Sequence, residues 1–534
     1  MWMPLLLAMC QTIPTIDWPV HDPERPLPPV IEGAQAVSIA PPADAVVLFD
    51  GSNLDHWRSG DGSPAPWKIE GTDLVVEPGT GILQTAEGYG DVQLHIEWMV
   101  PESMADKQGQ SRGNSGVFFM GQYEVQVLES RGSTTYADGM AAALYGQHPP
   151  THNVGAGIGQ WNSYDIFFQA PRFDGETLVS PAVLTVLHNG YLVQPGRVLT
   201  GPTAHKRRPA YSAHPGSLPI LLQDHGDPMR FRNIWLRRWH PLESGKDADE
   251  PARLRAVVEG LCHDNQPRSA SDPANLLLAG ESIARAWRSA GLDVEYQEFS
   301  VDKQRYRNIV AHVGPTEGKA LVLGAHYDSD AATPGADDNA SGVAALIGLA
   351  RAFREQPPAI PVELVAYTLE EEPAFGTVHM GSMHHAAQCR DEGRKLRGML
   401  SLEMLGYYSD EPDSQRYPLP ALAENYPDTA TFLALVTRPE DKEWMLELTA
   451  ALKPSLAFAL ETLCAPPSVP GIDLSDHRSY WSHGYPAAML TDTAFYRNPH
   501  YHEKGDRPET LDYVRLAQTV QGLAGMVRAL GAEH

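Results

Sequence analysis

Two patterns of hydrophobic and polar positions divide the chain. From Val46 to about Trp239, short runs rich in β-branched and aromatic residues alternate with Gly, Asp and Asn turns. In Glu124-Val-Gln-Val, polar and apolar residues alternate with period two, which is typical of a half-buried strand. Similar runs cover residues 91–98, 116–120 and 183–188. This succession of short strands predicts an all-β sandwich or jelly roll.

Strand and helix signals alternate in the second half. Apolar residues at helical spacing predict helices over residues 277–290, 341–353 and 513–530. Short apolar runs predict strands over residues 308–313, 320–324, 362–367, 398–402 and 487–490. The alternation is typical of an α/β domain with a mostly parallel central sheet.

Two segments without such periods suggest linkers. Residues 11–44 are rich in Pro, and residues 242–251 are rich in charge, Gly and Ser. We therefore expect a leading segment over residues 1–44, a sandwich over 45–241 and an α/β domain over 246–534. A short apolar run before Cys10 suggests the remnant of a secretory or lipoprotein signal, so we expect export, with a cytoplasmic location left open. No run is long enough to predict a transmembrane span.

Size and charge narrow the classes of protein. The 534 residues exceed what one core normally supports, which favours more than one domain. A net charge of −26 argues against nucleic acid or an anionic membrane as the main partner. The four cysteines, Cys10, Cys262, Cys389 and Cys464, are widely spaced and indicate neither a zinc ribbon nor a disulfide framework, although one buried pair among the last three stays open.

Acidic and histidine residues follow the apolar strands of the second half. His326 and Asp328 follow one strand, and a Gly/Pro-rich loop then leads to Asp337 and Asp338 before a helix. Further segments of this kind are the run 370–372, Glu403 and the stretch 498–511. Ligands in open α/β sheets bind at the carboxyl ends of strands. Two histidines with several carboxylates suit zinc, and a shared carboxylate can bridge two ions.

These segments resemble, over about residues 246–534, the M28 family of zinc aminopeptidases. The resemblance rests on His-Tyr-Asp-Ser, Gly-Ala-Asp-Asp-Asn-Ala-Ser-Gly, the Glu run, the strand-end acid and Tyr-His. It implies two Zn²⁺ ions, other divalent metals being possible, and a peptide or aminoacyl substrate. It further implies the following roles: His326 and His502 as metal ligands, Asp328 as the acid that orients His326, Asp338 as the bridging carboxylate with Asp337 as a neighbour that could be confused with it, and Tyr501 as the group that polarises the scissile carbonyl.

The three successive glutamates leave the register open. The family carries a general base followed by a ligand, and Pro373 with the later Met380-Gly-Ser favours Glu371 as base and Glu372 as ligand. A shift to Glu370 and Glu371 is the alternative. Glu403 lies where many members carry Asp as a terminal ligand, and Glu is competent but longer. His477 and His483 are expected to belong to a wall of the substrate pocket, with packing as the alternative, and His500 is expected to be structural or solvated.

Residues 46–240 resemble the DUF1080 group, or 3-keto-disaccharide hydrolase domains. The resemblance rests on Leu48-Phe-Asp-Gly-Ser-Asn-Leu-Asp-His-Trp, Arg112-Gly-Asn-Ser-Gly and Gln223-Asp-His-Gly-Asp-Pro-Met-Arg-Phe. It implies a concanavalin-like jelly roll and cleavage of 3-keto-glycosides. The candidates for a sugar-binding face are Arg112, Asn114, Glu124, Gln126, Glu129, Asp224 and His225. The alternative is that Arg112 and Glu124 pair structurally while Asn114 serves a turn.

The leading hypothesis is therefore an exported, metal-dependent aminopeptidase with an attached sugar-active or sugar-binding sandwich. One alternative places the main activity in the sandwich as a 3-keto-glycoside hydrolase, with the α/β domain auxiliary. Another is a non-enzymatic carbohydrate-binding scaffold.

Overall fold

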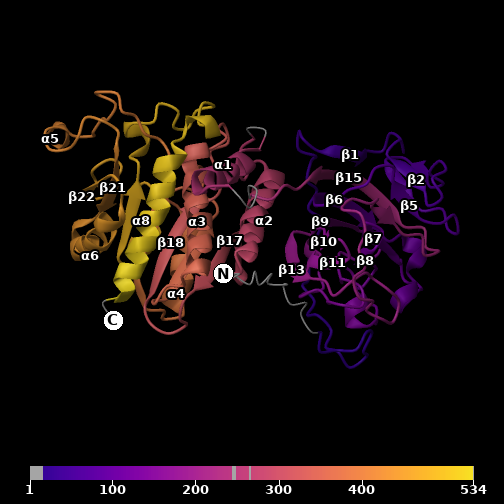
Figure 1. The fold of residues 1–534 in the computed structure, drawn as a ribbon. Helices are drawn as coiled ribbons and strands as arrows, with labels where there is room; N and C mark the ends of the chain where they lie inside the picture. The colour runs from indigo at the N-terminus through magenta and orange to yellow at the C-terminus, as the bar shows by residue number, and fades with distance from the viewer. Residues whose placement is uncertain (1–15, 243–247, 264–265, 533–534) are drawn as a thin grey trace, which may run out of the picture. The chain divides into compact units, whose positions relative to one another are not determined.

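The computed structural model describes residues 16–242, 248–263 and 266–532 (Figure 1). They form two compact units, which divide between His240 and Pro241. The signal remnant that the sequence suggests, with Cys10, lies outside the described residues, so export stays a prediction. Within the described ranges, no helix combines the length and the apolar character that crossing a bilayer requires. Cys262, Cys389 and Cys464 are free thiols rather than a disulfide pair.

The first unit is a sandwich of antiparallel sheets, as predicted. One sheet has the order β13-β12-β9-β6-β15-β4-β3, with β1 paired to β15, and the second has the order β2-β5-β14-β7-β8. The strands are β1 (Val46–Phe49), β2 (Trp57–Ser59), β3 (Lys68–Glu70), β4 (Asp73–Val75), β5 (Leu83–Thr85), β6 (Val92–Met99), β7 (Ser115–Phe119), β8 (Tyr123–Val127), β9 (Trp161–Gln169), β12 (Val183–His188), β13 (Tyr191–Val198), β14 (Leu221–Leu222) and β15 (Arg230–Arg238), with a separate hairpin of β10 (Arg172–Asp174) and β11 (Thr177–Ser180).

The alternation of residues along β8 decides what faces the core. Val125 and Val127 belong to the apolar core between the sheets, together with Val117 of β7. Because successive side chains point to opposite faces of a strand, Glu124 and Gln126 lie on the other face. Both are nevertheless buried, at 5% and 1% exposure, so other segments cover them.

The leading segment differs from the expected linker. Residues 16–44 contain no helix or strand among those described, but they are bound along the sandwich. The His21 amide and imidazole both contact the carboxylate of Asp138, at 3.0 and 3.2 Å. The Ile31 amide donates to the Asn153 carbonyl, and the Ile39 carbonyl accepts from the Trp235 indole. A segment can form hydrogen bonds to a folded surface without any hydrophobic period of its own. For this reason the sequence pattern alone predicted a linker here.

The second unit is an α/β domain, also as predicted. Its sheet has the order β16-β17-β19-β18-β20-β23-β21-β22. The strands β19, β18, β20 and β23 run parallel, whereas β16, β17 and the β21–β23 pairing are antiparallel, so the sheet is mixed. The strands are β16 (Val294–Val301), β17 (Gln304–Val313), β18 (Ala320–His326), β19 (Val362–Tyr367), β20 (Leu396–Glu403), β21 (Phe432–Thr437), β22 (Ala459–Cys464) and β23 (Ala487–Thr491).

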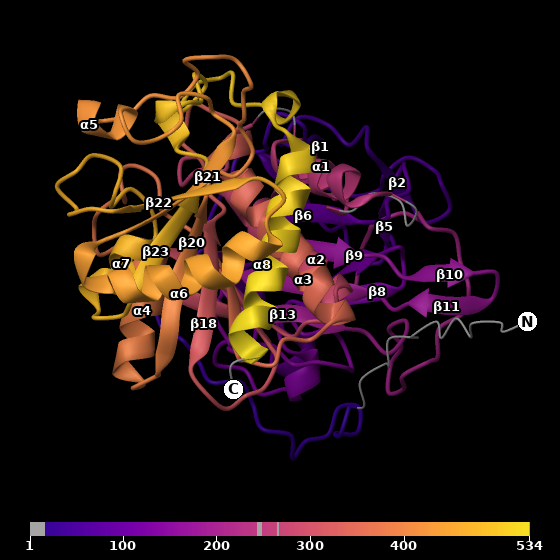
Figure 2. The same ribbon diagram turned by 60° about the vertical axis from the view of Figure 1, so that its left-hand side comes forward.

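Helices cover both faces of this sheet (Figures 1 and 2). Buried residues of α1, α2, α3, α6 and α8 share one core, and those of α4 and α7 share the other. The helices are α1 (Glu250–Leu261), α2 (Pro273–Ser289), α3 (Gly342–Glu355), α4 (Gly381–Asp391), α5 (Pro420–Ala423), α6 (Lys442–Leu452), α7 (His477–Ser482) and α8 (Tyr513–Ala532). A π-helical turn, η5 (Ala336–Ser341), precedes α3.

Two helices begin at other residues than predicted, because N-capping side chains determine where they start. The Asp249 side chain accepts from the Ala252 amide and starts α1 inside the segment expected as a linker. The Asp272 side chain accepts from the Asn275 amide, and Pro273 takes the first helical position of α2, four residues before the predicted start at position 277.

A buried charged group lies on the outer face of β6. The His95 imidazole contacts Asp165 of β9 at 2.7 Å and Glu97 at 3.7 Å, and it stacks on Trp235. Burial alone would lower the pKa of His95, but the charges of Asp165 and Glu97 and the hydrogen bonding to them raise it to about 9. The histidine is therefore protonated in the folded sandwich at neutral pH.

This pKa predicts a pH dependence of stability. Because the folded pKa of about 9 exceeds the unfolded value, the contribution is fully present below pH ~6.5 and is lost as the pH rises through about 9. We expect the sandwich of the wild-type chain to lose about 1–3 kcal/mol over this window relative to His95→Gln. Denaturant unfolding followed by tryptophan fluorescence at several pH values measures this difference. Parallel curves for the two proteins would contradict the assignment.

Candidate metal centre

Five segments bring acidic and histidine side chains to one edge of the α/β sheet. His326 ends β18, Glu403 ends β20, and Asp338 lies in η5. Glu370 and Glu371 follow β19, and His502 follows β23. Because β19, β18, β20 and β23 are parallel neighbours, their carboxyl ends meet at the same edge. The fold thus explains why residues far apart in the chain lie together.

Asp338 lies between the two histidines. Its Oδ1 is 3.3 Å from Nε2 of His326, and its Oδ2 is 3.2 Å from Nε2 of His502. Each carboxylate oxygen therefore faces a different imidazole, which is the arrangement that a bridging ligand requires. Asp337 points elsewhere: its oxygens accept from the Gly406 amide and the Asn498 side chain. The geometry favours Asp338 over Asp337 as the bridge.

A glutamate flanks each histidine. Oε1 of Glu403 is 3.5 Å from Nε2 of His326, and Oε2 of Glu371 is 3.4 Å from Nε2 of His502. Glu370 is 3.9 Å from His326. The ligand atoms of His326, Asp338 and Glu371 lie within 4.8 Å of one another, as do those of Asp330, Glu371 and His502.

These spacings fit metal coordination. Two ligands placed ~2.0–2.1 Å from one tetrahedral ion stand about 3.3–3.4 Å apart. The four distances of 3.2–3.5 Å around the two histidines agree with that value. Among the described residues, Asp338, Glu370, Glu371 and Glu403 have no Lys or Arg partner. The residues present fit a pair of divalent cations.

The buried charges perturb one another. Burial and neighbouring acids raise the pKa of Glu370, Glu371 and Glu403, which His326 partly counteracts. Burial would lower the pKa of His326, but Glu403 and Glu370 raise it well above its usual range. Burial would raise the pKa of Asp338, but its hydrogen bonds with both histidines lower it. Four carboxyl groups therefore share two imidazoles, and a bound cation would stabilise the ionised form of these carboxyls.

The preferred register, with Glu371 as base and Glu372 as ligand, has to be corrected because of where Glu372 lies. Its side chain is exposed, whereas Glu370 and Glu371 are buried in the cluster. The Asp328 carboxylate accepts from the amides of both Glu370 and Glu371, at 3.2 and 3.1 Å, and so fixes these two residues toward the site. The structure therefore favours the alternative pair, Glu370 and Glu371.

Several supporting residues escaped the sequence analysis. Ser475 donates to Glu403 at 2.7 Å, and Asp506 accepts from the amides of Asp337 and Asp338 at 2.8 and 3.1 Å. Asp330, two residues after Asp328, approaches Glu371 and His502. Ser475 lies two residues before His477, and Asp506 lies four residues after His502. This closeness to the candidate histidines was the signal that could have identified them.

Tyr501 and the remaining histidines have distinct positions. The Tyr501 ring stacks on His502 with centroids 3.9 Å apart, and with Glu403 it lines an adjacent cavity. Burial, and then the charge of Asp338, raises the pKa of its hydroxyl. His477 and His483 bind the carbonyls of Ile472 and Ser479. His500 packs near Tyr407.

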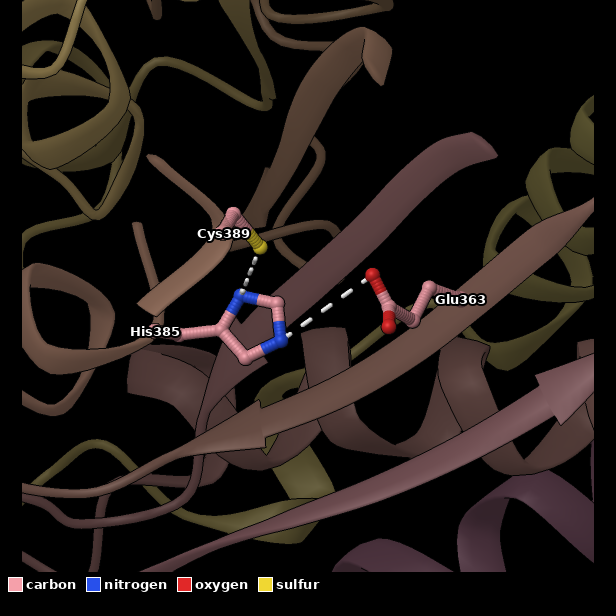
Figure 3. A group of neighbouring side chains, drawn as sticks. All are labelled: Glu363, His385 and Cys389. Atoms are coloured by element: carbon pink, nitrogen blue, oxygen red, sulfur yellow. Dashed lines mark hydrogen bonds and ion pairs between the residues drawn. The ribbon is translucent and has the colours of Figure 1, made fainter. Parts of the chain in front are cut away.

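A second group of side chains that could bind a metal lies on the face of the sheet that α4 and α7 cover. Figure 3 shows Cys389 near Nδ1 of His385, at 3.7 Å, and Glu363 near Nε2, at 4.0 Å. One ligand atom from each of the three residues lies within 4.8 Å of those of the other two. Nδ1 also contacts the Tyr480 hydroxyl, and Arg394 pairs with Glu363. Because Glu363 already has a cationic partner, the group fits a buried polar network rather than a metal centre.

The candidate sugar-binding residues of the sandwich separate into two sets. Asn114, Glu124 and Gln126 share one face, and the Gln126 amide donates to Asn114 at 3.2 Å. Three of the others form hydrogen bonds to backbone groups, and the fourth, His225, is exposed. Arg112 donates to the Gly132 carbonyl, and Glu129 accepts from the Arg131 amide. Asp224 accepts from the amides of Gly79, Gly81 and Gly226. No ion pair joins Arg112 to Glu124 among the residues described.

Comparisons with known proteins agree with this division. Residues 44–237 match the model of the 3-keto-alpha-glucoside-1,2-lyase-like domain, and residues 308–527 match that of peptidase family M28. The uncharacterized protein YfbL of Escherichia coli (strain K12) is 43% identical over 299 residues, covering 54% of this chain and 92% of that protein. Leucine aminopeptidase 1 of Fusarium vanettenii is 24% identical, covering 47% of this chain and 62% of that protein.

One solved structure is similar to part of this chain. A putative glycosyl hydrolase from Parabacteroides distasonis is 38% identical, covers 40% of this chain and 92% of that chain, and has a TM-score of 0.37.

Proposed function

We propose a metal-dependent aminopeptidase activity for this chain, which belongs to peptidase family M28 through its second unit and to the 3-keto-alpha-glucoside-1,2-lyase-like family through its first. The observation that carries the proposal is the position of Asp338, whose two oxygens face two different imidazoles at 3.2–3.3 Å. Glu403 and Glu371 complete the two sides at similar spacing.

The proposed ligands follow from these contacts. His326, Asp338 and Glu403 would hold one zinc ion, and His502, Asp338 and Glu371 would hold the other. Such a pair polarises a peptide carbonyl and lowers the pKa of water. Asp328, 3.6 Å from Nδ1 of His326, positions that imidazole.

The chain's own residues would carry the proton transfer. Glu370 is buried beside His326 and is left as the general base once Glu371 is a ligand. It takes a proton from the attacking water and delivers it to the leaving amine. The Tyr501 hydroxyl, kept protonated by burial, can donate to the carbonyl oxygen as negative charge develops there.

A second function is proposed for the sandwich, which is binding or cleavage of a keto-sugar. The Glu124 carboxylate is buried without a hydrogen-bond partner among the described residues, and burial raises its pKa to about 8. Oε1 of Gln126 on the same face is also unpaired. The hydroxyls of Tyr136 and Tyr145 contact each other at 2.9 Å. Burial raises the pKa of both hydroxyls, and the charge of Glu124 contributes to the increase. Unpaired buried polar atoms beside aromatic rings suit a ligand rich in hydroxyl groups.

The glutamate register can be tested by substitution. Glu370→Gln is expected to lower kcat by about 10²–10⁴-fold, because the base is lost, while bound metal is retained. Glu371→Gln is expected to lower the metal content as well. Glu372→Gln, a matched change at an exposed position, serves as the control and should alter neither. Kinetics and elemental analysis measure both properties. Loss of metal in the Glu372 variant, but not in the Glu371 variant, would restore the other register.

Metal removal provides an independent test. Chelated protein is expected to lose hydrolysis of aminoacyl p-nitroanilides and to unfold at a lower temperature, because the buried carboxylates lose their counter-charge. Added zinc should restore both. Unchanged turnover and unfolding after removal verified by elemental analysis would reject the proposal, and with it the choice of an enzyme over a scaffold for this unit.

The sandwich function predicts a role for Glu124. A 3-keto-disaccharide is expected to bind the wild-type chain, and Glu124→Ala is expected to weaken binding at least tenfold, because the ligand loses a buried hydrogen-bond partner. Glu176→Gln, on the exposed β10–β11 turn, is the control. Calorimetry measures binding, and product analysis in the Glu370→Gln background reports cleavage. Equal affinity in the Glu124 variant would place any sugar site elsewhere.

A further inference from the structure

A large cavity opens beside the candidate metal centre. Its lining residues include Glu403 and Tyr501, which place it next to the cluster of acids and imidazoles. An aminopeptidase substrate whose scissile bond lies at the metal centre would extend its amino-terminal side chain into this space.

The floor of the cavity is a straight row of residues across four strands. Glu403 of β20 pairs with Thr491 of β23, Thr491 pairs with Ala434 of β21, and Ala434 pairs with Glu461 of β22. Paired residues on neighbouring strands point to the same face of a sheet. All four line the cavity. With neighbouring strands ~4.8 Å apart, the backbones of Glu403 and Glu461 are about 14 Å apart.

Glu461 is an acidic group without a partner. Its side chain is half-buried and makes no hydrogen bond or ion pair with any described residue. Two aromatic side chains of the cavity, Tyr417 and Tyr426, lie beside it, with ring centroids 6.0 Å apart. The Tyr426 hydroxyl donates to the Thr462 carbonyl at 2.8 Å, next to Glu461. Burial raises the pKa of Tyr417 to about 12, and the charge of Glu461 contributes, which agrees with this proximity.

We propose that Glu461 determines substrate specificity by binding the cationic end of an amino-terminal Lys or Arg side chain. The inference rests on the proposed aminopeptidase function and adds the substrate class. A long basic side chain would extend along the row from the metal centre toward the edge strand, with its methylenes over Thr491 and Ala434 and its charged end directed at the Glu461 side chain. The rings of Tyr417 and Tyr426 can contact the cation.

A shorter apolar side chain would leave this acid unpaired. A leucine side chain would fill only the near part of the cavity and would form no ion pair with Glu461 at the far end. Arg416 also lines the cavity, but its side chain is exposed and makes no ion pair with Glu461 within the described part of the chain.

The test compares p-nitroanilides of Lys, Arg, Leu and Glu on the zinc-loaded full chain. The wild type is expected to favour Lys and Arg over Leu in kcat/KM, and Glu461→Gln is expected to lower the Lys-to-Leu ratio by about tenfold or more. Glu461→Lys should reverse the charge preference in favour of the Glu substrate. Glu443→Gln, which removes the same charge from the exposed surface of α6, is the matched control and should keep the wild-type ratio.

The outcomes separate the two proposals. Because a ratio between substrates cancels any loss of folded protein, a misfolded variant cannot mimic the effect. Wild-type activity without a preference for basic residues, or a preference that survives Glu461→Gln, would overturn the assignment of Glu461 while leaving the aminopeptidase intact. Absence of hydrolysis with every substrate would instead overturn the proposed function.

Discussion

The constraint on which the α/β unit depends is a cluster of four buried carboxyl groups and two imidazoles at one edge of its sheet. Asp338, Glu370, Glu371 and Glu403 are buried together, and His326 and His502 are their only basic contacts in the described part of the chain. Burying carboxylates without sufficient opposite charge costs several kcal/mol for each ion. A sequence that keeps such a group gives up stability unless a cation completes it. The distances of 3.2–3.5 Å between these side chains match the separation of two ligands on one tetrahedral ion.

Much of this arrangement could be predicted from the sequence because it depends on strand ends. Strands place the residues that follow them at one edge, so the local pattern places His326 and Glu403 there, whereas their role as ligands is what the resemblance to family M28 implies. The glutamate register could not, since three consecutive acids look alike and only the path of the chain after Tyr367 decides which ones turn inward. Asp328 determines that path through hydrogen bonds to two backbone amides. Ser475 and Asp506 were missed for a related reason: their roles are hydrogen bonds across 72 and 169 residues of sequence.

In the sandwich, the sequence predicted strands but not what covers them. Alternation along β8 places Glu124 and Gln126 away from the core, which suggested an open face. The structure shows both residues buried. The leading segment covers another part of this unit by hydrogen bonds, with Ser38 on Glu97 and Ile39 on Trp235, and helps to enclose the His95 ion pairs. Such contacts leave no period in the sequence. The result is a sandwich that carries buried titratable groups on faces that its strand pattern would assign to solvent.

One sheet of the α/β unit carries both the proposed metal centre and the residue proposed to determine substrate specificity. Its parallel centre supplies the proposed metal ligands, while the antiparallel pairing of β21 with β23 extends the floor of the cavity outward by two strands that carry none of them. Because paired residues share a face, a side chain on β22 is aligned with Glu403 without touching it. Changing the residue at position 461 therefore alters the far end of the cavity and leaves the cluster of acids and imidazoles in place. An edge strand has fewer neighbours to satisfy than a central one, so this is the position in the sheet where an unpaired acid is tolerated most easily.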